Sequence, residues 1–325
     1  MFTPNHRPAR RFLPIDLSII IVSWNVRDLL RRCLQSIAAG QGDLRLDVIV
    51  VDSGSIDGSP QMVAQEFPQV HLIACQENVG FPKGNNIGLV QAAGRYIMLL
   101  NPDTEIVGAA LPRLVSFLDN HPDVGVVGPQ LLYGDGRVQS SRRRFPTLAT
   151  AFLESTWLQP YAPSHILRHY YALDLPDTAT ADVDWVVGAA LMTRQEVVAQ
   201  VGEMDEGYFM YSEELDWCRR MKAAGWRVVY LPAAQIIHHE GKSSEQAVTA
   251  RHIYFQRARL RYFRKFHGVV PAFCLRLFLL VSYACQLLLE ATKGILGHRR
   301  DLRWQRVNAY WQVLRSGLHP AGYDS

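Results

Sequence analysis

The sequence predicts an α/β fold, with a Rossmann-like, mostly parallel sheet and helices on both of its faces. Between residues 17 and 127, short apolar runs alternate with helical segments, as they do when helices connect parallel strands. The runs are almost continuously apolar, which is typical of strands that are covered on both faces. Polar or glycine-rich turns follow several of these runs. In open α/β sheets, turns at the carboxyl ends of strands are where ligands bind.

The first half of the chain supplies strands and helices in alternation. In a segment such as 28–39, apolar side chains recur three and four positions apart with polar residues between them. Pro60 fits a first helical position behind a Ser59 cap, and Gly94 ends the next helix. The expected strands are 17–22, 47–51, 70–74, 96–100 and 124–127, and the expected helices are 28–39, one beginning at 60, one ending at 93, and 107–120.

The next part is less regular. Residues 131–138 are expected to form a hairpin, because Asp135-Gly136 supplies the positive φ that such turns need. Residues 142–182 have weak periodicity and are interpreted as an irregular crossing segment. A strand is expected at 183–193, whose small central residues allow a ligand or another strand to approach closely.

A capped helix and another strand follow. Ser212 fits the N-cap of a helix that Gly225 ends, and Glu213 and Glu214 lie in its first turn, where the helix dipole favours anions. The two glutamates are therefore compatible with an ordinary helix that has a solvated acidic start. A further strand is expected at 227–231.

An acidic turn ends the strand at 96–100. Asn101-Pro102-Asp103 cannot continue a central strand because proline has no N–H, so Asp103 is placed at a strand's carboxyl end. Taken alone, this turn is better explained as an ordinary Asx turn, since Asn, Pro and Asp are all turn formers. Asp52 occupies the corresponding end of 47–51, which allows the two carboxylates to face one cleft.

Composition and the lack of two phosphate-binding motifs narrow the function. The first strand leads into Ser-Trp-Asn rather than GxGxxG, and no P-loop is present, so a bound diphosphate would need a divalent cation held by carboxylates. The net charge of +4, with arginines gathered at 7–11, 142–144 and beyond 251, suits an anionic partner. No nucleic-acid-binding motif accompanies them. The cysteines lack CxxC spacing, which favours free thiols in a reducing compartment, and residues 1–14 lack a secretion signal.

Five sequence blocks, taken in order, carry a family resemblance. They are Ser23-Trp24-Asn25, the run from Val51 to Ser59, Asn78-Val79-Gly80-Phe81 with Gly84-Asn85-Asn86, Asn101-Pro102-Asp103, and the run from Tyr208 to Asp216. With these blocks the chain from about 15 to 243 resembles the inverting family 2 glycosyltransferases of the GT-A fold. It is most similar to the rhamnosyltransferase-like branch, which serves bacterial polysaccharide and cell-wall assembly.

The resemblance implies a donor site and a metal site. Asp103 matches the last acid of the family's DxD metal motif, with Asn101 in place of the first acid, and Mg²⁺ or Mn²⁺ is the implied cofactor. His238, in a His-x-x-Gly-x-Ser turn with Gly241 and Ser243, is a second candidate for the metal or diphosphate, and His239 is its rival. The implied nucleotide-binding residues are Ser23, Asn25, Asp52, Ser53, Gly80, Lys83 and Asn85, of which Asp52 would read the nucleoside.

The resemblance also implies a general base and a sugar pocket. Glu214 aligns with the base, which in many relatives is an aspartate, so Glu213 is kept as the alternative. The base would take a proton from the acceptor hydroxyl as it attacks the anomeric carbon. The residues expected to border the sugar or acceptor are Trp185, Gly188, Ala189 and Asp216, although Trp185 is equally compatible with a core position.

The C-terminal region has a different composition. Residues 251–266 mix arginines with aromatic side chains, and 269–289 are almost entirely apolar. The apolar run is long enough to span a membrane, but Pro271, Arg276 and Gln286 interrupt it. We therefore expect a membrane-associating helical segment on an anionic membrane surface. The alternative is a helical cap on the catalytic domain or on a second subunit.

The expected organisation is a basic tail at 1–14, a GT-A domain at 15–243 and a helical region at 244–325. The expected enzyme moves a sugar from a dTDP- or UDP-sugar, with dTDP-rhamnose as one candidate, to a saccharide or polyprenyl-linked acceptor. It would work in the cytoplasm at the inner face of the membrane. Two alternatives are an inactive scaffold of the same fold and a sugar-nucleotide pyrophosphorylase. A pyrophosphorylase should have a basic, glycine-rich loop after its first strand, and the residues from Ser23 to Arg27 do not fit such a loop.

Overall fold

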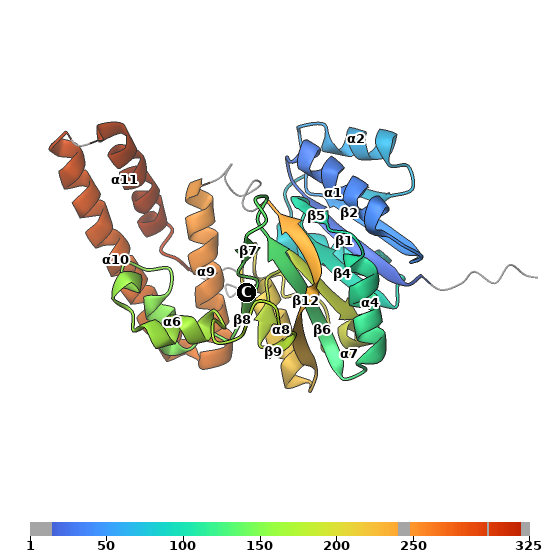
Figure 1. Cartoon of the computed structure of the whole chain (residues 1–325). Coiled ribbons are helices and arrows are strands. Elements are labelled where there is room, and N and C mark those ends of the chain that lie inside the picture. The colour runs from blue at the N-terminus through green and yellow to red at the C-terminus, as the bar shows by residue number, and fades with distance from the viewer. Residues whose placement is uncertain (1–14, 240–247, 298, 320–325) are drawn as a thin grey trace, which may run out of the picture.

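A computed structural model describes residues 15–239, 248–297 and 299–319, and shows an α/β body flanked by long C-terminal helices (Figure 1). The main sheet has the strand order β3-β2-β1-β4-β11-β6-β12-β5. Its strands on that path are β1 (Leu17–Ser23), β2 (Leu46–Asp52), β3 (His71–Ala74), β4 (Tyr96–Leu100), β5 (Thr104–Ile106), β6 (Val124–Leu132), β11 (Ala190–Arg194) and β12 (Arg227–His238).

The pairing confirms a mostly parallel first half. Strands β1, β2, β3 and β4 run parallel, while β11 lies antiparallel between β4 and β6, and β12 is parallel to β6. The expected hairpin is present, because β7 (Val138–Gln139) pairs antiparallel with β6. The short strand β9 (Ala181–Val183) pairs with β12, and β8 (Arg142–Arg143) pairs with β10 (Trp185–Val186) in a separate two-stranded sheet.

Helices cover both faces of the sheet, as the continuous apolar strands indicate. Ile20 of β1 belongs to one buried cluster, while Ile19 and Ile21 belong to the cluster on the opposite face. A Cβ at Gly88 would lie 2.4 Å from the Ile20 side chain, so this glycine allows the helix to pack closely on β1. The helices of the α/β body are α1 (Arg27–Gly40), α2 (Ser59–Glu66), α3 (Phe81–Gln91), α4 (Ala110–Asn120), α5 (Leu148–Leu153), α6 (Ser164–Tyr170), α7 (Gln195–Val201) and α8 (Glu213–Ala223).

One expected N-cap is shifted by a residue, and the other is at the expected position but lacks the side-chain hydrogen bond of a cap. Ser59 is the first residue of α2 rather than its cap, and Gly58 takes the cap position with φ 85°. Asp57 Oδ1 accepts the Ser59 N–H at 3.0 Å instead. Ser212 does precede α8, but its φ is 64° and its side chain makes no capping hydrogen bond.

Three expected segment boundaries were also wrong. The strand expected to end at 127 continues through Gly128 and Pro129 to Leu132, where β12 pairs with it through an irregular register. The segment 142–182 contains α5, α6 and a short 3-10 turn, so it is not wholly irregular. The strand expected at 183–193 is divided into β9, β10 and β11, because the backbone leaves the sheet around Gly188.

The C-terminal region consists of α9 (Val248–His267), α10 (Val269–Ile295) and α11 (Arg300–Arg315), which stand beside the body in Figure 1. Helix α9 is joined to α8 by an ion pair, since Lys265 Nζ lies 2.7 Å from Asp216 Oδ2. Among the described residues α10 is the helix with the length and mean hydropathy, 1.9, to cross a membrane; its most apolar window is 28% buried in the protein.

Candidate functional site

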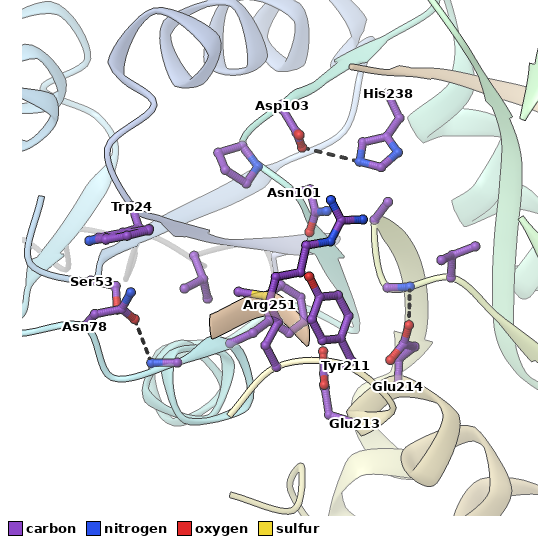
Figure 2. A pocket seen from close by; sticks show the side chains of 18 residues that line it. Trp24, Ser53, Asn78, Asn101, Asp103, Tyr211, Glu213, Glu214, His238 and Arg251 are labelled. Carbon is purple, nitrogen blue, oxygen red and sulfur yellow. Dashed lines mark hydrogen bonds and ion pairs between the residues drawn. The ribbon is translucent and has the colours of Figure 1, made fainter. Parts of the chain in front are cut away.

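A cavity of about 250 Å³, here called the main cavity, opens at the carboxyl ends of β1 and β4. It lies where α/β sheets bind ligands, and Figure 2 shows the side chains that surround it. Eight of the residues expected in the site line it: Ser53, Gly80, Asp103, Gly188, Ala189, Glu213, Glu214 and His238. The other residues of its wall are Val22, Trp24, Asn78, Phe81, Asn101, Pro102, Val187, Met210, Tyr211 and Arg251.

One side of the main cavity is built around Asn78. Asn78 Oδ1 accepts hydrogen bonds from Ser53 Oγ at 3.2 Å and from the Gly80 N–H at 3.0 Å (Figure 2). Gly80 has φ 80°, and a Cβ there would lie 2.6 Å from the Phe209 carbonyl oxygen. A glycine is required, because a side chain would be both strained and obstructed. This network fixes the wall beside Trp24.

Ser23 and Asp52 lie beneath this wall rather than in it. Ser23 is fully buried, and Asp52 is 1% exposed. Asp52 Oδ2 accepts the Ser55 N–H at 2.8 Å, whereas the buried Oδ1 has no hydrogen-bond partner among the described residues. A buried carboxylate oxygen without a donor is unfavourable, and nothing among the described residues compensates it.

The remaining expected nucleotide residues are absent from the wall of the main cavity. Asn25 connects two loops, since its Oδ1 accepts the Ile56 N–H at 2.8 Å. Lys83 is exposed on α3. Asn85 is buried and donates through Nδ2 to the Phe81 carbonyl at 2.9 Å. These three side chains therefore contact other parts of the protein or solvent, and not the main cavity.

Asp103 and His238 meet at one corner of the main cavity. His238 Nδ1 lies 2.8 Å from Gln139 Oε1, so this nitrogen is assigned as the donor of the ring. Nε2 then presents its lone pair 3.4 Å from Asp103 Oδ1 (Figure 2). Two electron-pair donors in this arrangement fit neighbouring positions around a divalent cation, whose ligands at about 2.1 Å lie about 3 Å apart.

The chain supplies a small donor set for such an ion. No group of three or more His, Cys, Asp and Glu side chains with metal-binding geometry occurs in the part of the chain that the structure describes. Mg²⁺ and Mn²⁺ suit this situation, because they are commonly held by one or two protein ligands together with substrate phosphates. His239 instead contacts Glu105 at 2.7 Å, and Gly241 and Ser243 lie outside the described residues.

The Glu213 and Glu214 carboxyl groups share the start of α8 but differ in surroundings. Glu214 Oε1 accepts the Gly188 N–H at 3.3 Å, and its Oε2 has no partner among the described residues. Burial, together with the negative charge of Glu214, raises the pKa of Glu213 well above its ordinary value. Burial also raises the pKa of Glu214. Such carboxyl groups are suited to accept a proton near neutral pH.

Trp185 and Asp216 lie away from the main cavity. Trp185 is 8% exposed and donates from Nε1 to the Arg144 carbonyl at 3.0 Å. Asp216 is fully buried, where it accepts a hydrogen bond from Tyr208 Oη at 3.1 Å and pairs with Lys265. In the structure Asp216 therefore connects α8 to α9 rather than bordering a ligand.

The expectations omitted several residues of the wall. Trp24 could have been found from strand alternation, because Val22 and Trp24 face the main cavity while Ser23 faces the sheet interior. Tyr211 precedes α8 with φ 75°, a strained conformation of the kind that gathers at functional sites. Arg251 enters from α9 (Figure 2), and no local signal separates it from the other arginines of that helix.

Comparisons with known proteins agree with this geometry. The model of the glycosyl transferase family 2 matches residues 18–177. The chain is 29% identical over 239 residues to an N-acetylglucosaminyl-diphospho-decaprenol L-rhamnosyltransferase of Mycobacterium tuberculosis, covering 70% of this chain and 77% of that one. It is 26% identical over 273 residues to the rhamnosyltransferase WbbL of Escherichia coli K12, covering 78% of this chain and 98% of the relative.

Solved structures share the fold. The mannosyltransferase PcManGT from Pyrobaculum calidifontis, in complex with GDP-Man and Mn²⁺, matches with a TM-score of 0.53 and 18% identity over 94% of this chain and 87% of that one. GalNAc-T7 with UDP, GalNAc and Mn²⁺ matches with a TM-score of 0.54 and 13% identity over 77% of this chain and 48% of that one. Together with the family model and the rhamnosyltransferases, they identify the chain as a glycosyltransferase of family 2 with the GT-A fold.

Proposed function

We propose that this glycosyltransferase moves a sugar, with inversion, from a dTDP- or UDP-sugar such as dTDP-rhamnose to a saccharide or polyprenyl-linked acceptor. The observation that carries the proposal is the main cavity itself. It places the Glu214 carboxylate, the Asp103–His238 corner and the Asn78 network around one space. These are a base, a site for a diphosphate and its cation, and a wall for a nucleoside.

We assign the nucleoside to the wall formed by Trp24, Ser53 and Asn78. The Trp24 ring offers a flat apolar surface to a base, and the polar groups beside it offer hydrogen bonds to a base or ribose. The unpartnered Oδ1 of Asp52 is an acceptor for the ring N–H of uracil or thymine. This match is the reason for naming UDP and dTDP as the donor nucleotides.

The diphosphate is assigned to the opposite corner. A divalent cation bound by Asp103 and His238 would offset the negative charge of the leaving diphosphate. Arg251 brings a permanent positive charge to the same cavity from α9. Because Asn101 stands where many relatives have a second acid, this guanidinium has a larger share of the charge neutralisation here.

Glu214 is assigned as the general base. Both carboxyl groups of the pair are buried, and burial raises the pKa of each; the negative charge of Glu214 also raises the pKa of Glu213. The Gly188 N–H holds one Glu214 oxygen, which leaves Oε2 to remove the proton of the acceptor hydroxyl. The hydroxyl oxygen then attacks the anomeric carbon from the face opposite the diphosphate, which gives inversion.

The C-terminal helices are assigned to the inner face of the cell membrane. Residues four positions apart on α10, namely Val269, Phe273, Leu277 and Val281, are each more than half exposed and form one stripe. An exposed apolar stripe beside arginine-rich helices suits an anionic lipid surface. A membrane position would bring the enzyme to a polyprenyl-linked acceptor. A second copy of the chain remains the alternative occupant of this stripe.

Turnover of a donor panel tests the enzymatic assignment. The chain is incubated with UDP-, dTDP- and GDP-sugars, Mg²⁺ or Mn²⁺ and a bacterial lipid extract, and products are read by mass spectrometry. We expect a dTDP- or UDP-sugar to be consumed, and the Asp103→Asn and Glu214→Gln variants to be inactive. No turnover by the wild type would favour an inactive scaffold, whereas full activity of both variants would refute the roles assigned to Asp103 and Glu214.

Vesicle flotation tests the membrane assignment. We expect the chain to float with vesicles rich in phosphatidylglycerol. With neutral phosphatidylcholine vesicles it should stay unbound at the bottom of the gradient. Phe273→Glu with Leu277→Glu should abolish flotation. Ile56→Glu is the control, because Ile56 is an exposed apolar residue on the α/β body, away from α10. Flotation that survives the α10 changes, with dimerisation lost instead, would assign the stripe to a second copy.

A further inference from the structure

A second cavity of about 200 Å³ lies on the far side of the Glu214 side chain. Glu214, Val187 and Tyr211 line both cavities and so form the partition between them. The remaining wall comes from α5 and the residues beside it, from Tyr170 of α6, from β10, from the start of α8 and from α9. We infer that this second cavity binds a neutral sugar ring of the acceptor, an inference that rests on the proposed function.

The position of the second cavity fits the acceptor. In Figure 2, Asp103 and His238, which are assigned to the leaving diphosphate, lie toward the top of the view, and Glu214 lies toward the bottom. An inverting displacement needs the attacking hydroxyl on the side of the sugar opposite the leaving group. A hydroxyl that enters from the second cavity meets Glu214 on that side, so the base lies between donor and acceptor.

The lining of the second cavity fits a sugar. Tyr170, Trp185 and Phe255 present aromatic surface, on which the apolar face of a pyranose ring can pack. The charged side chains in the wall are Glu154, Glu214 and Arg259, which offer hydrogen bonds of both kinds. Two carboxyl groups beside one guanidinium disfavour a diphosphate and suit the hydroxyl groups of a neutral saccharide.

Arg259 supplies a hydrogen-bond donor that nothing in the described protein uses. The residue is 7% exposed, and its Nη2 donates to the Glu154 carbonyl at 2.8 Å at the end of α5. Its buried Nη1 has no partner among the described residues. The guanidinium is thus held in place by one nitrogen while the other is uncommitted. A hydroxyl or N-acetyl oxygen of the sugar would satisfy this nitrogen.

Binding of simple glycosides without donor tests the inference. The probes are the methyl glycosides of N-acetylglucosamine, glucose, galactose, mannose and rhamnose, with binding to the full chain read by saturation-transfer NMR and titration. We expect at least one probe to bind the wild type and to bind Arg259→Met about tenfold more weakly. Ala151→Leu, which fills the second cavity without removing a charge, should weaken the same probe.

Arg257→Met is the matched control, since Arg257 lies on the same helix and lines neither cavity. Circular dichroism and thermal melting confirm that each variant is folded. The inference is overturned if no probe binds the wild type, if both cavity variants bind as the wild type does, or if pyrophosphate displaces the probe. Donor turnover is measured separately, so a chain that binds glycosides yet consumes no nucleotide sugar refutes the proposed function alone.

Discussion

The proposal that Glu214, and not its buried neighbour Glu213, is the general base can be tested by changing each residue in turn. Glu214→Gln keeps the size of the side chain and the oxygen that accepts the Gly188 N–H at 3.3 Å, and removes only the ability to take a proton. Loss of a general base lowers kcat by about 10²–10⁴-fold, which corresponds to about 3–5 kcal/mol of barrier. The KM for the donor should change little, because the nucleotide wall is untouched.

Glu213→Gln should behave differently. The wild-type rate should fall as the pH drops through a value above 4.5, because burial holds the pKa of Glu214 above that ordinary value and only the carboxylate can accept the proton. The pKa of Glu213 is raised well above its ordinary value, so Glu213 is neutral while Glu214 titrates and adds no repulsion to it. In Glu213→Gln this limb of the pH profile should therefore keep its position, and most of the activity at neutral pH should be kept.

The assay is the initial rate of nucleoside diphosphate release at saturating donor and acceptor between pH 4.5 and 9. Both variants are compared with the wild type, and thermal melting confirms that they are folded. If Glu213→Gln abolished the activity and Glu214→Gln retained it, the assignment of the base would be reversed. An acidic limb that moved in Glu213→Gln would show that Glu213 is charged while Glu214 titrates, which would contradict this reasoning.

Three further outcomes are expected. Gly80→Ala should lower the stability by about 1–3 kcal/mol and raise the donor KM, because a Cβ would meet the Phe209 carbonyl at 2.6 Å; urea unfolding and donor titration measure both effects. Arg251→Ala should lower kcat/KM by about tenfold, with Arg251→Lys recovering part of it, whereas an unchanged value would remove this residue from the diphosphate site. Burial opposes ionisation of Asp205, but hydrogen bonds from two α9 cations outweigh it and lower its pKa from 3.8 to about 2. Stability should therefore be full above about pH 4 and decline by about 2 kcal/mol as the pH falls to about 2, a dependence that urea unfolding should find absent in Asp205→Asn.

The parallel half of the sheet could be predicted because burial on both faces leaves continuous apolar runs. The same reasoning placed Asp103 at a strand end, and it lies there in the structure. The pairing of the strands was harder to predict, because the periodicity of a segment does not reveal which strands lie next to it. Strand β11, for example, runs antiparallel between β4 and β6. The division of 183–193 also escaped prediction, because it serves the cavity at Gly188 rather than the sheet.

The site was predictable where a residue follows directly from a strand or helix end. Glu213 and Glu214 were identified with their helix, and both line the main cavity. Arg251 and Arg259, which line the two cavities, were not predicted there, because their positions depend on how α9 packs against α8 and against the more distant α5. Asp216 was misplaced for the same reason, since its ion-pair partner is Lys265.

The contact between α8 and α9 bears on how the enzyme can be shortened. A chain cut after residue 243 would leave the fully buried Asp216 without its 2.7 Å partner Lys265, and Asp205 without Arg261. Asp216 would keep Arg220, whose Nε lies 2.8 Å from Oδ1, and the Tyr208 hydroxyl, but its Oδ2 would lose the charged partner from α9. Removing α9 should therefore weaken the packing of α8, the helix that carries Glu213 and Glu214. A shortened chain that ends after α9 should be more stable than one that ends before it.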